Sequence, residues 1–156
     1  MRKINPEYVE RISSITNQCP YFKLLSMKIR ELEVGRSLLE IDLQEKHLQP
    51  FGLVHGGVFA SIIDAASFWA AYSEVTDDSG MTTVDLKLNY LAPAEAGKLI
   101  ARGRCIKLGK TLGLAEAKVT NERGRLLAHG TSTLMVIPGL GIKSPLPHPS
   151  KFVEDR

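Results

Sequence analysis

The sequence predicts an α+β fold in which a mostly antiparallel sheet packs against one long buried helix. Three observations support this prediction. The stretch from Gly56 to about Glu74 is apolar almost all round and rich in alanine and serine, as expected of a helix buried on most sides. Segments with alternating polar and apolar residues occur on either side of it. Short turns join these segments, which favours antiparallel pairing.

A short helix is predicted near the start of the chain. Asn5 suits its N-cap and Pro6 its first helical position, and apolar residues recur at helical spacing before Asn17. The sequence Gln18–Pro20 is expected to break this helix. Two strands with a glycine turn between them, and then a loop, are predicted before the long helix, at residues 27–34, 37–43 and 46–54.

Four more strands are predicted after the long helix, at residues 82–90, 99–107, 112–120 and 126–137. Alternation in the first of them puts Thr82 and Leu86 on one face and Thr83 on the opposite face. The last part of the chain holds repeated glycines and prolines and ends in charges, which predicts a flexible or loosely docked tail. The chain is therefore predicted to be one domain, 1–138, followed by the tail 139–156.

Composition argues against several classes of protein. With 156 residues, 44% hydrophobic and 24% charged, the chain has the size and balance of one globular domain. A dispersed net charge of +3 predicts no nucleic-acid partner. Two cysteines and four histidines without ligand spacing predict neither a disulfide framework nor a metal site. No segment has the pattern of a signal peptide or a membrane span, so a cytoplasmic protein with no membrane partner is expected.

Asp64 is the most informative residue of the long helix. Its neighbours are mainly apolar, and burial of an ionised carboxylate without partners is costly. The side chain must therefore be paired, protonated or directed into a cleft. A functional role is one interpretation. The structural alternatives are a narrow exposed stripe with Ser61 and Ser67, or a hydrogen bond inside a subunit interface.

The second candidate is the sequence His55-Gly56-Gly57 at the start of the same helix. Glycine lets a backbone approach a ligand closely, and the first amides of a helix have no internal acceptor, so they can hold an anion or a developing oxyanion. The alternative is that the glycines only form a tight turn. Gly56 lies about 12 Å from Asp64 along the helix, too far for both to act on one carbonyl carbon. If both are catalytic, we expect them to come from two subunits of a dimer.

Three stretches carry a resemblance to a known family. They are Gly52–Asp64, with its His-Gly-Gly sequence shortly before the aspartate, Thr83–Pro93 and Gly97–Thr111. Over roughly residues 34–136 the chain resembles the hotdog-fold acyl-CoA thioesterases, in particular their PaaI-type branch. The resemblance implies an antiparallel sheet wrapped around one long central helix. It also implies a homodimer, often paired into a dimer of dimers (a homotetramer), with active sites at the dimer interface.

The resemblance further implies roles for individual residues. Asp64 aligns with the family's catalytic carboxylate, as general base or nucleophile, and the Gly56 amide aligns with the group that polarises the thioester carbonyl. Gln49 and Thr83 align with polar residues that orient water or the carboxylate, and His55 is expected to shape the loop. The implied substrate-binding residues are Gly57, Phe68, Lys107, Gly109, Lys110 and Thr111. Core packing is the alternative for the phenylalanine, and solvated surface charge is the alternative for the lysines.

An acyl-CoA substrate and no separate cofactor are therefore expected. One alternative is a hotdog hydratase, although the Asp–His pair typical of that chemistry is not found in its usual motif. Another is a non-catalytic acyl-CoA sensor, although the N-terminal stretch is too short and too weakly basic for a DNA-binding unit. A third is a structural dimer with a vestigial cleft. Aromatic, medium-chain and long-chain acyl groups all remain open.

Overall fold

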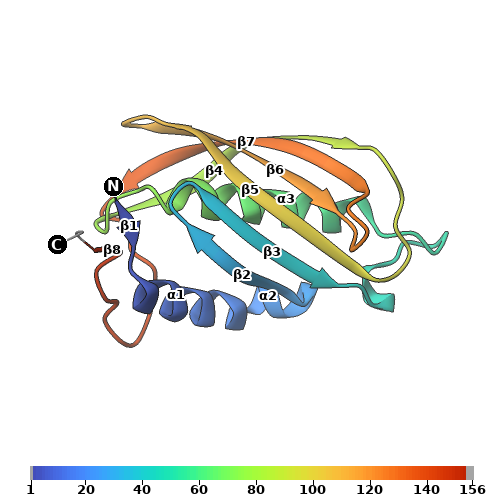
Figure 1. Cartoon of the computed structure of the whole chain (residues 1–156), viewed down its shortest axis with the longest axis horizontal. Coiled ribbons are helices and arrows are strands. Elements are labelled where there is room, and N and C mark those ends of the chain that lie inside the picture. Colours follow the sequence, from blue (N-terminus) through green and yellow to red (C-terminus); the bar gives the residue numbers. More distant parts are fainter. Residues whose placement is uncertain (1, 154–156) are drawn as a thin grey trace.

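A six-stranded antiparallel sheet curves around the long helix α3, as Figure 1 shows for the computed structural model of the chain. The structure describes residues 2–153. The strand order is β2-β3-β5-β6-β7-β4, and β1 pairs with β8 in a separate two-stranded sheet. The elements are β1 (Lys3–Ile4), α1 (Pro6–Gln18), α2 (Pro20–Leu25), β2 (Met27–Glu33), β3 (Arg36–Asp42), a 3-10 turn (Glu45–His47), α3 (Gly56–Tyr72), β4 (Ser79–Tyr90), β5 (Lys98–Leu108), β6 (Leu112–Thr120), β7 (Leu126–Pro138) and β8 (Phe152–Val153). The predicted α+β fold is confirmed.

Small residues hold α3 close to the sheet. Ala66 and Ala70 of α3 are fully buried. A Cβ atom at Gly103 of β5 would lie 2.1 Å from the Ala66 carbonyl oxygen, and a Cβ atom at Gly130 of β7 would lie 2.8 Å from Ile63 Cγ2. Side chains at these two glycines would therefore push the helix away from the sheet. Close packing of this kind explains why the sheet side of α3 is both apolar and rich in small residues.

The N-terminal segment forms two helices where one was predicted. The Asn5 side chain accepts a hydrogen bond from Glu7 N–H, and Pro6 opens α1, as expected. Pro20 was expected to belong to the break after the helix, but it opens α2 instead. Proline suits the first turn of a helix, where its missing N–H has no intrahelical acceptor to lose. Ser26 ends α2 in the left-handed region, with a φ of 53°.

The strand β4 contains a bulge that changes the face on which Thr83 lies. Pairing with β7 places Thr83 opposite Leu134, and the register then shifts before Asp85. Val84 is therefore an extra residue in the strand, and its side chain is exposed. The prediction that Thr83 and Leu86 lie on opposite faces is wrong, because the extra residue moves the alternation by one. Both side chains are half-buried on the α3 side of the strand.

The segment 139–153 after β7, which we call the C-terminal strap, returns to the N-terminal part of the chain (Figure 1). Asn5 N–H donates a hydrogen bond to the Lys151 carbonyl at 2.8 Å, and β8 pairs with β1. The Lys151 side chain is fully buried and its amine donates to two carbonyl oxygens near the end of α3, at 2.7 and 3.0 Å. The expected flexible or loosely docked tail therefore has defined contacts over this range. Its last residues, 154–156, lie outside the described residues.

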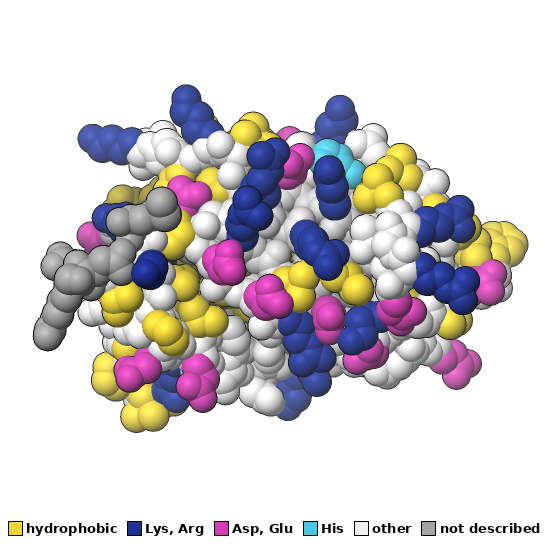
Figure 2. All heavy atoms as spheres, viewed as in Figure 1, with side chains coloured by type: hydrophobic (Ala, Val, Ile, Leu, Met, Phe, Trp, Pro, Cys, Tyr) yellow, Lys and Arg dark blue, Asp and Glu magenta, His cyan; other side chains and the backbone are white. Residues whose placement is uncertain are grey.

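Charged side chains of both signs are interspersed on the surface. Figure 2 shows this for the face that it displays. On the sheet, Glu116 of β6 binds Arg104 at 2.6 Å and His129 at 3.0 Å. Hydrogen bonds from His129 and then Arg104 hold the pKa of the Glu116 carboxyl below its usual value. The absence of a nucleic-acid partner stays a prediction.

Candidate active site

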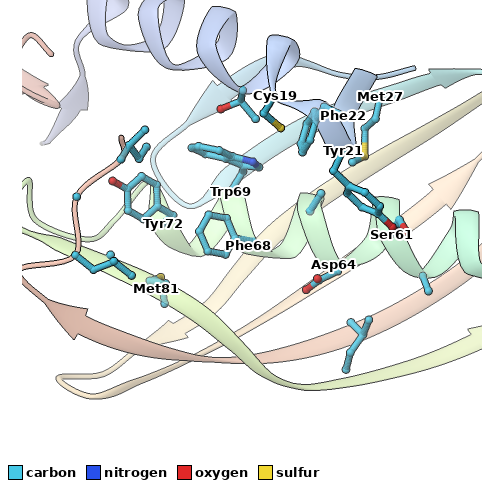
Figure 3. A pocket seen from close by; sticks show the side chains of 18 residues that line it. Cys19, Tyr21, Phe22, Met27, Ser61, Asp64, Phe68, Trp69, Tyr72 and Met81 are labelled. Atoms are coloured by element: carbon cyan, nitrogen blue, oxygen red, sulfur yellow. Dashed lines mark hydrogen bonds between the residues drawn. The ribbon is translucent and has the colours of Figure 1, made fainter. Parts of the chain in front are cut away.

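The Asp64 carboxylate lies near the middle of α3 and is half-buried. Figure 3 shows it on α3 at the edge of a pocket. Thr83 Oγ1 of β4 donates a hydrogen bond to Asp64 Oδ1 at 2.7 Å. An ionised carboxylate has about four acceptor positions, and no other hydrogen bond to the Asp64 side chain forms within residues 2–153. The second carboxylate oxygen is therefore available to a water molecule or a substrate.

The pocket around Asp64 is large and mainly apolar. Its volume is about 620 Å³, which is within the range of small-molecule sites. One wall is α3, and the other walls come from α1 and α2, from β4 and from the C-terminal strap (Figure 3). Side chains in these other walls include Cys19, Tyr21, Phe22, Met81, Leu86 and Ile142. Such surroundings suit an apolar ligand group placed beside a single carboxylate.

Aromatic side chains follow one another on the pocket side of α3. The ring of Phe68 lies 5.4 Å from that of Trp69 and 5.6 Å from that of Tyr72, measured between centroids. Nearer the start of the helix, Tyr21 of α2 binds the hydroxyl of Ser61 at 2.6 Å. For Phe68 an acyl contact and core packing were both open. The structure places it half-buried in the pocket wall.

The start of α3 has the geometry of an anion-binding helix end. His55 is the N-cap, and its Nδ1 accepts a hydrogen bond from the Gly57 amide at 2.8 Å. Because Nδ1 is the acceptor, the proton of the neutral ring is assigned to Nε2. Gly56 N–H has no intrahelical acceptor, and no other group among residues 2–153 accepts from it. The cap therefore uses one amide of the glycine pair and leaves the other available.

Gln49 lies beside Gly56 in a second, smaller hollow of about 370 Å³, which Phe59 and Tyr90 also line. The Gln49 side-chain oxygen accepts a hydrogen bond from Phe51 N–H in its own loop, so its NH₂ group remains as a donor. Tyr90 Oη donates to the Gly56 carbonyl at 3.2 Å. This bond fixes the end of β4 to the start of α3.

Of the predicted CoA-binding residues, Lys107 lies near the end of β5, and Gly109, Lys110 and Thr111 form the exposed turn between β5 and β6. Gly109 N–H donates to the Leu112 carbonyl at 2.8 Å and closes the turn. Lys107, Lys110 and Thr111 are exposed. Neither the Asp64 pocket nor the Gln49 hollow includes this turn, so one protomer does not bring it together with the other predicted residues.

The structure thus divides the predicted site residues into three groups. The first group lies at the larger pocket, which we call the carboxylate half-site: Asp64, Thr83 and Phe68. The second group lies at or next to the smaller hollow, which we call the amide half-site: Gln49, His55, Gly56 and Gly57. The third group is the exposed turn.

Sequence reasoning missed several contributors to these half-sites. Tyr21 belongs to α2, a helix that was not predicted, although the proline before it is a recognised helix-start signal. Tyr90 was placed on a strand, but nothing local indicates its bond to Gly56. The strap residues at the pocket were assigned to the tail, because glycines and prolines carry no periodic signal.

Two further observations bear on cofactors and membranes. Within the part of the chain that the structure describes, no three His, Cys, Asp or Glu side chains are placed to share a metal ion. No helix in that part is long and apolar enough to cross a bilayer. The cytoplasmic location and the absence of a cofactor stay predictions.

The sequence was compared with models of known protein families. The model described as "Thioesterase superfamily" matches residues 51–128, which is half of the chain. The chain belongs to the thioesterase superfamily. This result confirms the resemblance that the segment around His55 and Asp64 suggested.

Relatives and solved structures extend the similarity beyond this match. The thioesterase is 30% identical over 112 residues to a 1,4-dihydroxy-2-naphthoyl-CoA hydrolase from Listeria monocytogenes, covering 72% of this chain and 91% of the relative. It is 31% identical over 101 residues to human acyl-coenzyme A thioesterase 13, covering 64% of this chain and 71% of the relative. These relatives confirm that the protein is a thioester hydrolase.

Solved structures confirm the hotdog fold. A thioesterase from Haemophilus influenzae superposes with a TM-score of 0.81 at 22% identity, covering 90% of this chain and 97% of the other. The PaaI protein of Escherichia coli superposes with a TM-score of 0.78 at 19% identity, covering 87% of this chain and 97% of the other.

Proposed function

We propose that this thioesterase hydrolyses an acyl-CoA ester to a carboxylic acid and CoA at two sites of a homodimer. In each site, Asp64 of one protomer acts as general base or nucleophile, and Gly56 N–H of the other polarises the thioester carbonyl. The observation that supports this most strongly is the separation of a half-buried carboxylate and an available amide into two incomplete half-sites. CoA esters are proposed because two relatives are named as a naphthoyl-CoA hydrolase and an acyl-coenzyme A thioesterase.

Distance along α3 argues against one protomer supplying both groups. Asp64 follows Gly56 by eight residues, which corresponds to about 12 Å of helix. A general base must lie within about 3 Å of the proton that it removes, or one water molecule away. An oxyanion donor must lie about 3 Å from the developing oxyanion. A single small carbonyl group cannot meet both conditions inside one protomer.

The free edge of β4 offers a way to bring the half-sites together. β4 ends the sheet, with β7 on one side and no neighbouring strand on the other within the described residues. A free edge of 12 residues is a template for pairing with another copy. Thr83 lies in the first half of β4, at the carboxylate half-site, whereas Tyr90 lies at its end, at the amide half-site. Antiparallel pairing of β4 with its two-fold copy would therefore set each carboxylate half-site beside the partner's amide half-site.

The proposed reaction consumes one water molecule. In the general-base route, Asp64 removes a proton from water, the water oxygen attacks the carbonyl carbon, and the C–S bond breaks as the sulfur leaves and takes up a proton. In the nucleophilic route, an Asp64 oxygen attacks the carbonyl carbon and expels CoA, and water then hydrolyses the resulting anhydride. Thr83 holds one carboxylate oxygen in both routes and leaves the other for the reaction.

The β5–β6 turn remains our proposal for contacts to the CoA phosphates. Phosphates are bound by cations and by backbone amides. Lys107 and Lys110 supply exposed positive charge on either side of Gly109. In each site, the turn that contacts the CoA phosphates would be the one, from either protomer, that lies beside the bound ester. A dimer of dimers stays a prediction of the family resemblance.

The proposal is tested by measuring thiol release from phenylacetyl-, hydroxybenzoyl-, hexanoyl- and palmitoyl-CoA. We expect Asp64→Asn to lower kcat/KM by about 10²–10⁴-fold, the usual contribution of a positioned acid or base. The matched control is Asp42→Asn, because Asp42 lies on β3 with its side chain 63% exposed and lines neither half-site. Thermal unfolding and light scattering verify that both variants stay folded and keep the oligomeric state of the wild type.

Three results would contradict different parts of the proposal. A folded wild type that hydrolyses no ester in the panel would contradict the proposed hydrolysis of acyl-CoA esters. Wild-type activity in the Asp64→Asn variant would leave the proposed hydrolysis intact but contradict the catalytic role of the carboxylate. Full activity in a monomer would contradict the proposal that two protomers share each active site.

A further inference from the structure

The Asp64 pocket extends along α3 and ends near its C-terminus. The lining residues Ser61, Asp64, Phe68 and Tyr72 recur at three- and four-residue spacing and so share one face of the helix. Tyr72 follows Asp64 by eight residues, which places it about 12 Å farther along the helix. The pocket is therefore an elongated channel along α3: one arm runs from the carboxylate toward the end of the helix, and the pocket also continues past Asp64 to Ser61 and Tyr21.

The C-terminal strap helps to form the far end of this channel. Leu140, Gly141 and Ile142 line the same pocket as Tyr72 and Met81. Figure 3 shows Tyr72 and Met81 together at one end of the pocket, with Asp64 well separated from them along α3. Apart from the Tyr72 hydroxyl, the side chains at this end are apolar. The end of the channel therefore suits the methyl terminus of an acyl chain better than a polar group.

Close contacts hold the strap in this position. A Cβ atom at Gly80 of β4 would lie 2.5 Å from the Leu140 carbonyl oxygen and 2.8 Å from Leu140 Cγ, so the absence of a side chain there lets the strap lie directly on β4. Gly139 N–H donates to the Asp78 carbonyl at 2.8 Å, which fixes the first residue of the strap beside the start of β4.

Lys151 anchors the other end of the strap. Its buried Nζ donates to the Tyr72 carbonyl at 3.0 Å and to the Val75 carbonyl at 2.7 Å, and it lies 3.8 Å from the centroid of the Tyr72 ring. The backbone N–H of Lys151 binds the Asp77 carboxylate at 3.1 and 3.2 Å. The strap is thus fastened to the same residue, Tyr72, that marks the end of the channel.

We propose that the C-terminal strap closes the far end of the acyl channel and limits the length of the acyl chain. This inference rests on the proposed function, because it takes Asp64 as the point where the thioester sits. Each C–C bond of about 1.5 Å advances an extended chain by roughly 1.3 Å, so 12 Å holds about nine or ten carbons. The substrate class is therefore a medium-chain aliphatic acyl thioester. Much longer chains would have to displace the strap.

The test is a profile of kcat/KM for unbranched acyl-CoA esters of 4, 6, 8, 10, 12 and 16 carbons. We expect the wild type to be most active at 8–10 carbons. Leu140→Ala and Ile142→Ala enlarge the closed end, and each should raise the ratio of kcat/KM for 12 carbons to that for 8 carbons by about tenfold. Leu146→Ala is the matched control, since Leu146 belongs to the strap, is 57% exposed and does not line the channel.

Binding provides a second measurement that does not depend on turnover. The same esters are titrated into Asp64→Asn protein by calorimetry, with and without Leu140→Ala. We expect affinity to rise with chain length up to about ten carbons and then to fall, and the fall to move to longer chains with Leu140→Ala. Thermal unfolding verifies that each variant is folded.

The outcomes separate this inference from the proposed function. Hydrolysis with equal activity toward 10 and 16 carbons, or ratios unchanged in both strap variants, would overturn the strap limit and leave the thioesterase intact. No hydrolysis by the wild type, together with a chain-length limit in binding that moves with Leu140→Ala, would overturn the proposed reaction and keep the strap limit. No binding of any ester would overturn both.

Discussion

The two half-sites, one at the start of α3 and one along its middle and second half, are built in different ways. The amide half-site comes mainly from one short stretch, in which Gln49, the His55 cap and Gly56 all lie within nine residues, and only the end of β4 is added from elsewhere. The carboxylate half-site is assembled from α1, α2, α3, β4 and the C-terminal strap, which span almost the whole chain. The first is small and open at a helix end, whereas the second is a larger apolar channel.

This difference indicates which task each half-site is suited to: the common chemical step or the selection of the acyl group. Backbone amides at a helix start act on any carbonyl oxygen, so the amide half-site is suited to the common step of thioester chemistry. In the proposed reaction the long apolar channel would contact the variable part of a substrate, so the carboxylate half-site is suited to selecting the acyl group. Substitutions at the two half-sites should therefore have different signatures.

At the amide half-site, the largest effect is expected from removing one amide proton. Gly56 occupies the first helical position, and His55 before it is extended, so proline fits the backbone there and removes the N–H while adding its ring carbons. We expect Gly56→Pro to lower kcat by about 10²–10³-fold, as loss of an oxyanion donor does. Gly56→Ala is the control, because it adds the Cβ atom, 3.3 Å from the Tyr90 hydroxyl, and keeps the N–H. Equal activities for the two variants would exclude the amide from catalysis.

A mixture of two inactive variants tests whether the half-sites meet across an interface. Asp64→Asn and Gly56→Pro protomers are unfolded together, refolded together and compared with each variant refolded alone. Half of the resulting dimers contain both chains, and one of their two sites combines an intact carboxylate with an intact amide. We expect about a quarter of wild-type activity to return. No recovery, with mixed dimers verified by mass spectrometry, would place both groups of a site in one protomer.

A smaller effect is expected from the hydrogen bond that orients the carboxylate. Thr83→Val keeps the shape of the side chain and removes the hydroxyl that donates to Asp64. Hydrogen bonds to charged groups contribute about 1.5–3 kcal/mol, so we expect a loss of roughly 10–100-fold in kcat with little change in KM. Thr82→Val is the same substitution on the neighbouring, exposed residue of β4 and should have no effect. Equal losses in both variants would point to disturbance of the strand.

The smallest effect concerns Lys151, which anchors the strap beside the carboxylate half-site. Burial lowers the pKa of its amine from 10.5 to about 8, and Asp77 partly opposes this shift. Between about pH 8 and pH 10 the folded chain has lost this proton while the unfolded chain still holds it, so the free energy of unfolding rises with pH. We expect this contribution to be about 1–2 kcal/mol by pH 9.5.

Urea unfolding at pH 7.5, 8.5 and 9.5 measures this effect, with Lys151→Met as the comparison. The variant should lack this rise in the free energy of unfolding. Above pH 10 the free energy of unfolding falls again, because burial raises the pKa of Tyr8 and Tyr72 in the folded chain. The unfolded chain then loses its tyrosine protons at lower pH than the folded chain does, which favours unfolding. An identical pH dependence in wild type and variant would mean that Lys151 titrates alike in the folded and unfolded chains.

Local sequence was sufficient for most of the fold and for choosing the candidate reacting groups. The apolar run of α3, the alternating strands and the N-cap at Asn5 each depend on neighbours within a few residues, and each was predicted correctly. The helix α2 was missed because Pro20 acts both as a break and as a helix start, and only the contacts of the following residues decide between the two.

The β4 bulge shows where local reasoning fails at the site itself. Alternation placed Thr83 on the face opposite Leu86, whereas the family resemblance gave it a role beside Asp64. One extra residue in β4, Val84, turns the Thr83 side chain toward the helix. A bulge is determined by pairing with β7 and by packing on α3, so neither the polar pattern nor the propensity of β4 predicts it.

The sequence by itself determined the family of this protein and the candidates for its chemistry: a carboxylate and a pair of glycine amides on one apolar helix, in the pattern of a thioesterase. Tertiary structure alone decided that these groups lie in two separate pockets, that Thr83 reaches Asp64, and that the strap lines the apolar pocket beside Asp64. Chemistry can be predicted because it depends on residue type and spacing along one helix. The shape of the site cannot, because its walls come from segments more than a hundred residues apart, and only folding brings them into contact.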